Sequence, residues 1–154
     1  MFLGYQNGEI KFYTEEPLNK EIYNIDEIVE TQDEYVLNDE NEYVLKTTEW
    51  EEEQKQKERE RIAMLSLTRG DVFRGLLQAK GITRAQIRAM IEGNEGLSEV
   101  EKEMALIDFD EALNFYRGNA LINVLGASLG VTSEQLDKFF ETNDYKTLIG
   151  EENE

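Results

Sequence analysis

The chain has 154 residues, of which 40% are hydrophobic and 10% aromatic, and its formal net charge is −18. This composition can build one domain, or a small domain with an appendage, so wholesale disorder is not expected. Cysteine and histidine are both absent, which excludes disulfides, thiolate chemistry and imidazole groups as bases or metal ligands. The first residues, MFLGYQNGEIK, do not have the pattern of an export signal, and no stretch approaches the roughly 18 apolar residues of a membrane span. We therefore expect a cytoplasmic protein that does not enter a membrane.

The charge is distributed unevenly along the chain. Residues 1–60 hold 18 acids and 6 bases, and residues 93–154 hold 14 acids and 4 bases. Residues 61–92 instead hold 2 acids and 6 bases. A negative surface repels nucleic acid and attracts basic partners, so the basic island is the exception that needs an explanation. Its segment LTRGDVFRGLLQAKGITRAQIR supplies four candidate partner-binding residues: Arg69, Arg74, Arg84 and Arg88.

The first 46 residues predict a small antiparallel β unit made of two hairpins. FLGYQ and EIKFY flank Asn7-Gly8, a pair typical of tight hairpin turns. EYVL occurs at Glu34–Leu37 and again at Glu42–Leu45, with NDEN between the two copies as a loop. The isoleucines of segment 21–30 recur every third residue, a spacing compatible with either a strand or a short helix. We expect extended structure there.

The tyrosines concentrate in this N-terminal unit. Most of them should lie in its core or form cross-strand pairs. Because aromatic residues are enriched at protein interfaces, some are also candidates for a contact surface. The candidates are Tyr5, Tyr13, Tyr35 and Tyr43.

Residues 47–66 predict a polar connecting helix. Thr48 and Glu51 have the spacing of a capping box, and acids precede bases as the helix dipole prefers. The segment from Glu51 to Arg61 is almost wholly polar, so it can bury little by itself. We expect a solvated connecting helix and not a partner-binding coil.

Residues 67–154 predict a helical domain of about four to five helices, which makes the chain α+β. Thr68, Thr83 and Ser98 stand where helix N-caps would lie, and Gly81 and Gly93 where helices would end. On the first helix, the apolar stripe expected to face inward is Val72, Leu76 and Leu77, and the sequence leaves undecided whether Phe73 belongs to it. On the second helix, the residues expected to face inward are Ile87, Met90 and Ile91.

The third helix of this domain is expected to be the longest and to form the centre of the core. It would begin at Ser98 and end at Gly118. Its apolar residues have helical spacing in two adjacent stripes. These residues are Val100, Met104, Ile107 and Ala112 in one stripe, and Leu106, Phe109, Leu113 and Tyr116 in the other.

Two segments resemble a helix-turn-helix, namely RGLLQAKGITRAQIRAMI and NVLGASLGVTSEQLDKFF. The second places Glu134 and Asp137 on the helix that would meet DNA. The first places Arg84, Gln86 and Arg88 there, but within a strongly acidic protein. We expect packed helical hairpins and no direct nucleic-acid binding, and a helix-turn-helix regulator is the third of three functional interpretations.

No arrangement of residues points to catalysis, a cofactor or a metal. The nucleotide-binding patterns GxxxxGK[ST] and GxGxxG and the nucleophile pattern GxSxG do not occur. The segment 38–42 lacks the glycine and the terminal glutamate of a calcium-binding loop. Asp108 and Glu111 are helical neighbours without a complete ligand set. We therefore predict a protein that is not an enzyme and binds no cofactor or metal.

Two long segments resemble small uncharacterised proteins encoded by phages and prophages of low-GC bacteria, near tail or tail-fibre genes. They are EYVLKTTEWEEEQKQKERERIAMLSLTRGDVFRGLLQAKGITRAQIRAMIEG and ALIDFDEALNFYRGNALINVLGASLGVTSEQLDKFFETNDY. The resemblance implies a genomic context and no mechanism. No functional residue can be transferred from it.

Two further functional interpretations follow. In the first, the protein is a tail or baseplate component or an assembly factor, found in the host cytoplasm or the virion, and it binds a phage structural protein. The basic island would dock on an acidic surface of the same chain, of a partner or of a second copy, so a homo-oligomer is one expectation. In the second, it is an acidic inhibitor of a basic host defence enzyme, as anti-CRISPR proteins are, and its carboxylates occupy a nucleic-acid channel. The carboxylates concerned are Glu51, Glu52, Glu53, Glu99, Glu103, Asp108, Asp110 and Glu111.

Overall fold

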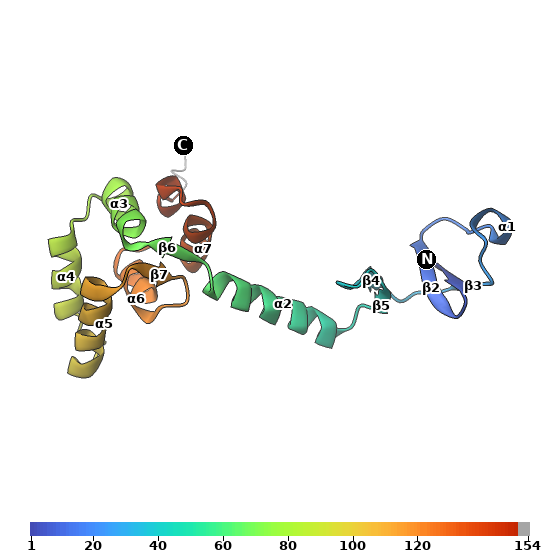
Figure 1. Ribbon diagram of the computed structural model, residues 1–154, viewed down its shortest axis with the longest axis horizontal. Helices are drawn as coiled ribbons and strands as arrows, with labels where there is room; N and C mark the ends of the chain where they lie inside the picture. Colours follow the sequence, from blue (N-terminus) through green and yellow to red (C-terminus); the bar gives the residue numbers. More distant parts are fainter. Residues whose placement is uncertain (151–154) are drawn as a thin grey trace. The chain divides into compact units, whose positions relative to one another are not determined.

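The computed structural model describes residues 1–150 and is α+β, as the sequence predicted (Figure 1). The chain divides into two compact units, Met1–Gln56 and Lys57–Glu154. The division falls inside helix α2 (Thr48–Ala63), and therefore inside the segment 47–66 expected to connect the β unit to the helices. The last four residues of the expected helical domain, 151–154, lie outside the described residues.

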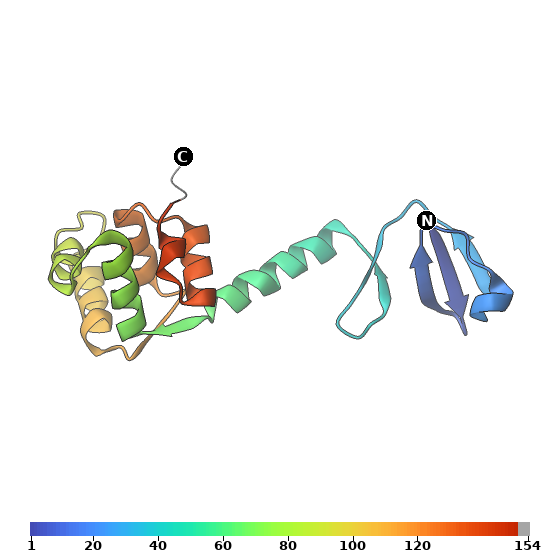
Figure 2. The same cartoon turned by 90° about the horizontal axis from the view of Figure 1, so that it is seen from above.

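The first unit contains a three-stranded antiparallel sheet and a separate hairpin. Strands β1 (Phe2–Gln6), β2 (Glu9–Thr14) and β3 (Glu27–Glu30) lie in the order β2-β1-β3, which Figure 2 shows in blue. Asn7 and Gly8 have φ values of 54° and 80°, which confirms the predicted tight turn. Strands β4 (Tyr35–Leu37) and β5 (Tyr43–Leu45) confirm the second predicted hairpin.

The segment 21–30 is only partly extended, so the expectation for it was wrong at its start. Residues Lys20–Tyr23 form the short helix α1. The side chain of Asn19 accepts hydrogen bonds from the backbone N–H groups of Glu21 and Ile22, which favours the helical turn. The later part of the segment forms β3 and adds a third strand to the predicted hairpin.

Helix α2 buries no residue, which confirms its predicted polar character. Its N-terminal cap differs from the prediction by one position. The Thr47 hydroxyl accepts a hydrogen bond from the Trp50 N–H at 3.1 Å, and the Glu51 N–H donates to the Thr47 carbonyl at 3.0 Å. The helix begins at Thr48, so Thr47 and not Thr48 is the residue that caps it.

The second unit contains five α-helices and a final 3₁₀ turn among its described residues. They are α3 (Arg69–Lys80), α4 (Arg84–Glu92), α5 (Glu99–Glu111), α6 (Ala120–Ser128), α7 (Ser133–Thr142) and η1 (Tyr145–Leu148). Thr68, Thr83 and Ser98 cap α3, α4 and α5 as predicted. Gly81 ends α3 with a φ of 67°, a conformation that glycine adopts without strain.

Most of the predicted core residues of α3 and α4 are buried. Ile87 and Ile91 are completely inaccessible, and Phe73 is buried together with Val72. Met90 is half-buried, and Leu77 is the exposed exception, because half of its surface is accessible. Leu77 lies one turn after Phe73 on the same side of α3, and its exposure matters for the site described below.

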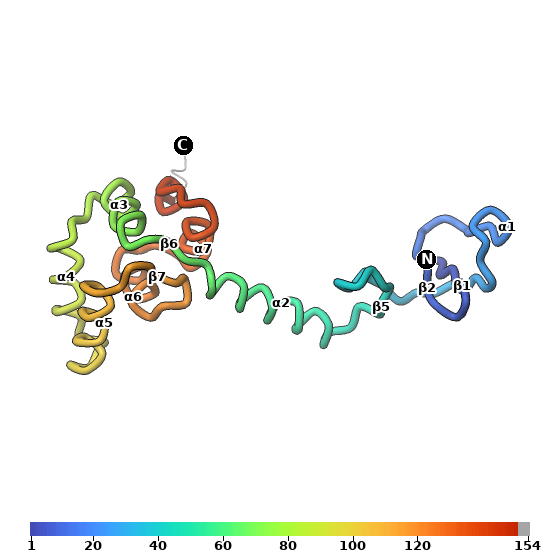
Figure 3. Tube along the Cα trace, viewed as in Figure 1, coloured from blue at the N-terminus to red at the C-terminus, as the bar shows by residue number. Residues whose placement is uncertain are grey.

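Helix α5 ends at Glu111, well before the predicted end at Gly118. Residues Asn114–Tyr116 form strand β7, which pairs with β6 (Ser66–Thr68) and can be followed in Figure 3. The strand alternates exposed, buried and exposed residues, and Phe115 at its centre is 1% exposed. This pairing joins distant parts of the chain, so helical spacing in the local sequence could not reveal it.

Helix α5 is also neither the longest helix nor the centre of the core. Among the described helices α2 is longer, and only Phe109 of α5 is buried. Val100, Met104 and Ile107, which were expected inside, are exposed. The core instead gathers between α3, α4, α6 and α7 around aromatic rings of Phe73, Phe115, Phe139 and Phe140.

Two glycines allow helices of this unit to approach closely. A Cβ atom on Gly75 of α3 would overlap the buried ring of Phe139 in α7. A Cβ atom on Gly126 of α6 would lie 2.6 Å from Leu136 Cδ1. Alanine at Gly75 would therefore force the packed Phe139 ring aside, whereas alanine at Gly126 would require the end of the Leu136 side chain to shift.

A buried arginine joins β7 to α6 and α7. The side chain of Arg117 is 7% exposed, and its Nε donates to Asp137 Oδ1 at 2.6 Å. The other guanidinium nitrogens donate to Asn123 Oδ1 at 2.7 Å and to Ser133 Oγ at 2.8 Å. Because each of the three guanidinium nitrogens finds a partner and one partner is a carboxylate, the charge is compensated inside the fold. The signal in the sequence was its isolation, since residues 93–154 hold only 4 bases.

The start of α5 should lose stability in acid. The Ser98 backbone N–H donates to the Glu101 carboxylate at 2.8 Å, and this bond, with the Ser98 hydroxyl, lowers the pKa of Glu101 below its ordinary value of 4.5. A carboxylate whose pKa is lower in the folded than in the unfolded chain stabilises the fold when the pH is above its unfolded pKa. This stabilisation is lost as the pH falls through its folded pKa. We therefore expect α5 to fray as pH falls below about 4.5.

Glu101→Gln should remove this acid sensitivity while keeping the capping box. Gln86 and Gln135 already fill the same position in the boxes of α4 and α7. Urea unfolding of both proteins at neutral and acidic pH, followed by far-UV circular dichroism, measures the effect. Equal pH dependence for the two proteins would show that the Glu101 cap does not contribute.

Candidate protein-binding groove

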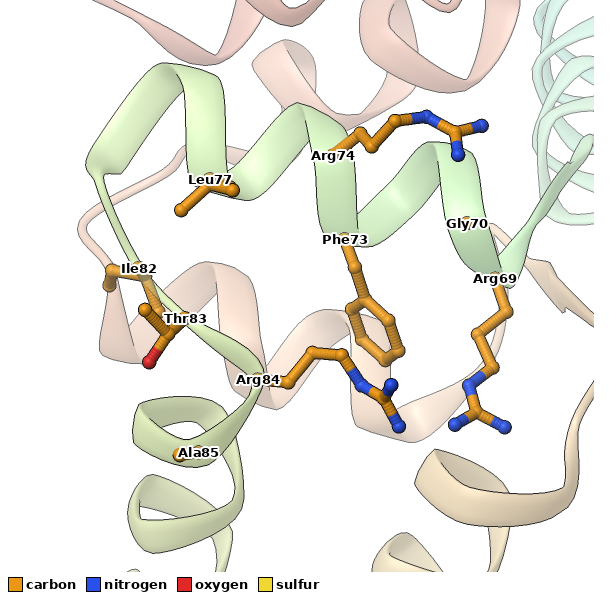
Figure 4. A pocket seen from close by; sticks show the side chains of 9 residues that line it. All are labelled: Arg69, Gly70, Phe73, Arg74, Leu77, Ile82, Thr83, Arg84 and Ala85. Carbon is orange, nitrogen blue, oxygen red and sulfur yellow. The ribbon is translucent and has the colours of Figure 1, made fainter.

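A groove lies on the surface between α3 and the start of α4. The row Arg69, Phe73 and Leu77 is spaced by four residues, so these side chains follow one another along one side of α3. The turn after Gly81 then brings Ile82 and Arg84 opposite this row. The groove has a volume of about 640 Å³ and is lined by Arg69, Gly70, Phe73, Arg74, Leu77, Ile82, Thr83, Arg84 and Ala85 (Figure 4).

Aromatic rings form the floor beneath the guanidinium groups. The rings of Phe73 and Phe109 lie 5.1 Å apart between their centroids. The Arg84 Cζ atom lies 5.7 Å from the Phe73 centroid and 6.0 Å from that of Phe109, and the Arg69 Cζ lies 5.8 Å from Phe73. Figure 4 shows Arg69 and Arg84 reaching toward the Phe73 ring from different sides. Such cation–π contacts hold flat guanidinium groups over the rings and leave their N–H donors available.

The arginines differ in how far their charge is already satisfied. Arg88 binds both carboxylate oxygens of Asp110, at 2.5 and 2.6 Å, and this contact raises the pKa of Arg88. Arg69 donates a hydrogen bond to the backbone carbonyl of Asp110. Arg84 has no ion pair and no side-chain hydrogen bond with any residue in 1–150. Its charge is therefore held in place by rings and directed at solvent.

Arg74 stands at the outer edge of the groove. Its side chain is 68% exposed and binds Asp71 Oδ1 at 2.6 Å. The Thr68 hydroxyl, and then Arg74, lower the pKa of Asp71. Figure 4 shows Arg74 extending along α3, away from the Phe73 ring. An exposed pair of this kind contributes little to stability, so Arg74 can exchange Asp71 for another carboxylate.

Three of the four arginines predicted from the basic island therefore meet at one groove, and the fourth does not line it. Arg88 lies beside the floor, where it contacts Phe109 and pairs with Asp110. The sequence did not identify the apolar half of the site. Leu77 was expected in the core and Ile82 was given no role, and the local signal for both was their position beside arginines of α3 and α4.

The predicted tyrosines have internal contacts in the first unit. The Tyr13 ring lies 5.5 Å from that of Tyr35 and 6.1 Å from that of Tyr43, so these rings join the sheet to the second hairpin. Burial raises the pKa of Tyr35. Tyr5 and Tyr43 line a second hollow of about 520 Å³ between the two hairpins. Tyr13, Tyr35 and Tyr43 thus help to hold the β unit together, and Tyr5 shares the hollow with Tyr43.

The carboxylates predicted for an inhibitor are divided between the two units. Glu51, Glu52 and Glu53 lie in the first unit and the other five in the second. Asp108 accepts a hydrogen bond from Asn119 at 3.1 Å, and Asp110 is bound by Arg88. Of the five predicted carboxylates in the second unit, Glu99, Glu103 and Glu111 are exposed, all on α5.

Comparisons with known protein families, curated proteins and solved structures found no match to this chain. Within residues 1–150, no helix is both long and apolar enough to cross a membrane. Over the same residues, no three acidic side chains come together in a way that could hold a metal ion. The groove is thus the feature of the second unit from which a function can be argued.

Proposed function

We propose that the protein is a non-enzymatic protein-binding protein, and that the α3–α4 groove docks an acidic, partly apolar segment of its partner. The observation that carries the proposal is Arg84, an arginine with no carboxylate partner among residues 1–150, placed over aromatic rings beside an exposed leucine. Arginine and aromatic groups are enriched at the centres of protein interfaces. The exposed half of Leu77 offers apolar area, and the guanidinium groups select for carboxylates.

A protein segment fits this site better than a nucleic acid does. The arginine next in line on α4, Arg88, is already neutralised by Asp110, so the helix presents no row of free charges to a phosphate backbone. The chain as a whole carries −18 and repels polyanions at long range. A short acidic segment with leucine-like side chains matches both halves of the groove.

The resemblance of the sequence to phage and prophage proteins encoded near tail genes suggests the biological setting. On this basis the partner belongs to a tail or baseplate, and the protein is a virion component or an assembly factor. Capture from infected cells with the wild type and with a groove variant tests the setting. Tail proteins bound by the wild type alone support it, whereas a basic nuclease released by high salt would favour an inhibitor.

Reversing the charge of two groove residues should abolish docking. The probe is a fluorescein-labelled amphipathic peptide of leucines and glutamates, about 15 residues long, which offers one apolar and one acidic face. We expect Arg74→Glu/Arg84→Glu to weaken its binding at least about tenfold in fluorescence anisotropy, because two attractions become repulsions. Binding by the wild type should also fall with added salt.

The matched control is Lys138→Glu/Lys146→Glu, which changes the net charge equally on exposed residues outside the groove. It should bind the probe nearly as the wild type does. A second control peptide with lysine at every glutamate position measures unspecific attraction to the acidic surface, and its binding should not weaken in the Arg74→Glu/Arg84→Glu variant. Equal loss of affinity in both double variants would contradict the proposal, because overall charge and not the groove would then control binding.

A further inference from the structure

An apolar stripe on α5 has no partner in the described structure. Val100, Met104 and Ile107 are 68%, 62% and 52% exposed, and their spacing of four and three residues places them on one face of the helix. A helix that exposes three large apolar side chains in a row is typical of a contact surface. We call these three residues the α5 stripe.

Acidic side chains border the α5 stripe. Helix α5 holds six acids and one base, and the helical rotation places Glu103 on one side of the stripe, Asp108 on the other and Glu111 at its end. Glu103 and Glu111 are exposed and have no ion pair with any residue in 1–150. The α5 stripe and its acids therefore match the chemistry proposed for the segment that enters the groove.

The α5 stripe cannot enter the groove of its own chain. Phe109, which faces Phe73 at the floor of the groove, lies nine residues after Val100 and so on the opposite side of α5. Arg88 and Asp110 further fix α5 against α4, its neighbour in Figure 1. The stripe therefore points away from the groove, and only another molecule can bring the two together.

We infer that the α5 stripe of one copy docks in the α3–α4 groove of a second copy. Val100, Met104 and Ile107 would contact Leu77 and Ile82, and the flanking glutamates would pair with Arg74 and Arg84. This is recognition of a helix by a groove, read out by side chains at i, i+4 and i+7. The inference rests on the proposed function and names a second copy as the occupant.

Such a contact is head-to-tail, because the two surfaces differ. Each bound copy still has one free groove or one free stripe, so the contact generates rings or open filaments and not a closed symmetric pair. The arginines of the groove and the glutamates beside the α5 stripe determine which surfaces meet and in which alignment, more than how tightly they bind. The assembly should therefore depend on protein concentration and weaken as salt is added.

Sedimentation velocity of the full chain tests the inference. We expect a weak contact, with a dissociation constant between about 10 µM and about 1 mM. Over this range of protein concentration, the wild type should change from monomer to larger species. The groove variant Arg74→Glu/Arg84→Glu and the stripe variant Glu103→Lys/Glu111→Lys should each associate at least about tenfold more weakly. All four positions are exposed, and circular dichroism of each variant checks that the helices remain.

Mixing the two variants tests whether groove and stripe bind each other. The intact stripe of the groove variant matches the intact groove of the stripe variant, and the two charge-reversed surfaces also carry opposite charges, so an equal mixture should regain the association that each variant alone has lost. A chain carrying all four substitutions exchanges both charges and should regain self-association. A mixture that stays monomeric, or a wild type that stays monomeric throughout the range, would overturn the inference.

The leucine–glutamate peptide distinguishes this failure from failure of the proposed function. If the wild type stays monomeric but still binds the peptide through Arg74 and Arg84, the groove is a docking site whose occupant is another protein. If neither the peptide nor a second copy binds, the groove itself is not a docking site.

Discussion

Phe109→Ala should lower the free energy of unfolding by about 3–5 kcal/mol, the range for removing a buried phenylalanine. The ring is 1% exposed and is the one buried side chain of α5. It packs on Phe73 and lies beneath Arg84 and Arg88. Its loss therefore opens a cavity and removes the contact that holds α5 to the floor of the groove.

Urea unfolding followed by far-UV circular dichroism measures the effect of Phe109. Phe109→Leu keeps most of the volume and should lose about 1–2 kcal/mol, because the remaining cavity is smaller. Ile107→Ala, on the exposed side of the same helix, should change stability by no more than about 0.5 kcal/mol. Similar losses for Phe109→Ala and Ile107→Ala would mean that α5 does not depend on its buried face.

Arg117→Ala should lower the free energy of unfolding by about 3–5 kcal/mol, the usual result of removing one partner from a buried ion pair. The substitution leaves Asp137, Asn123 and Ser133 without the donors that now satisfy them. Asp137 is itself only 28% exposed, so water replaces the lost partner incompletely. The three groups belong to α6 and α7, so the junction of these helices should loosen first.

A double-mutant cycle with Asp137→Ala identifies the pair as the cause. If Arg117 and Asp137 act together, the double variant should lose clearly less stability than the two single losses added. Lys138→Ala, next to Asp137 but exposed, should change stability by no more than about 0.5 kcal/mol. Strict additivity would show that the buried arginine acts through packing alone.

The parts of the fold that were predictable depend on neighbours in the sequence. Helix caps at Thr68, Thr83 and Ser98 and the turn at Asn7-Gly8 are local hydrogen-bonding and φ preferences, and the structure confirms them. Strand β7 was missed because its partner β6 lies far away in the chain, and aromatic residues with helical spacing also suit a strand. The prediction that α5 would be buried at the centre of the core was wrong for a related reason. Helical periodicity shows that a helix has an apolar face, but it does not show what covers that face.

The candidate site was predictable in its charges and not in its shape. Residues 61–92 hold more basic than acidic side chains, and this excess identified Arg69, Arg74 and Arg84 as candidates. The sequence could not show that Phe109 of α5 would come to lie beneath Arg84, or that Asp110 would neutralise Arg88. Both contacts join helices whose positions are decided by packing, so the difference between a free and a satisfied arginine appears only in the folded chain.

The arginines of the basic island surround the α3–α4 groove, and this position explains why an acidic chain keeps them together. Arg69, Arg74 and Arg84 line the groove, and Arg88 lies beside its floor, paired with α5. Arg74 is paired with Asp71 at the outer edge, whereas Arg69 and Arg84 have no carboxylate partner among residues 1–150. The complementary acids and apolar residues lie on the exposed face of α5. A chain with both surfaces has the means to bind its own copies as well as a partner.

The central claim, that the α3–α4 groove is a protein-docking site, is tested most directly by nuclear magnetic resonance of the full-length, isotope-labelled protein. The unlabelled leucine–glutamate peptide is added, and backbone amide shifts are followed residue by residue. The account predicts that the largest shifts cluster between Arg69 and Arg84 and disappear in the Arg74→Glu/Arg84→Glu variant. Shifts that are absent, or that fall mainly outside this segment in the wild type, would contradict it.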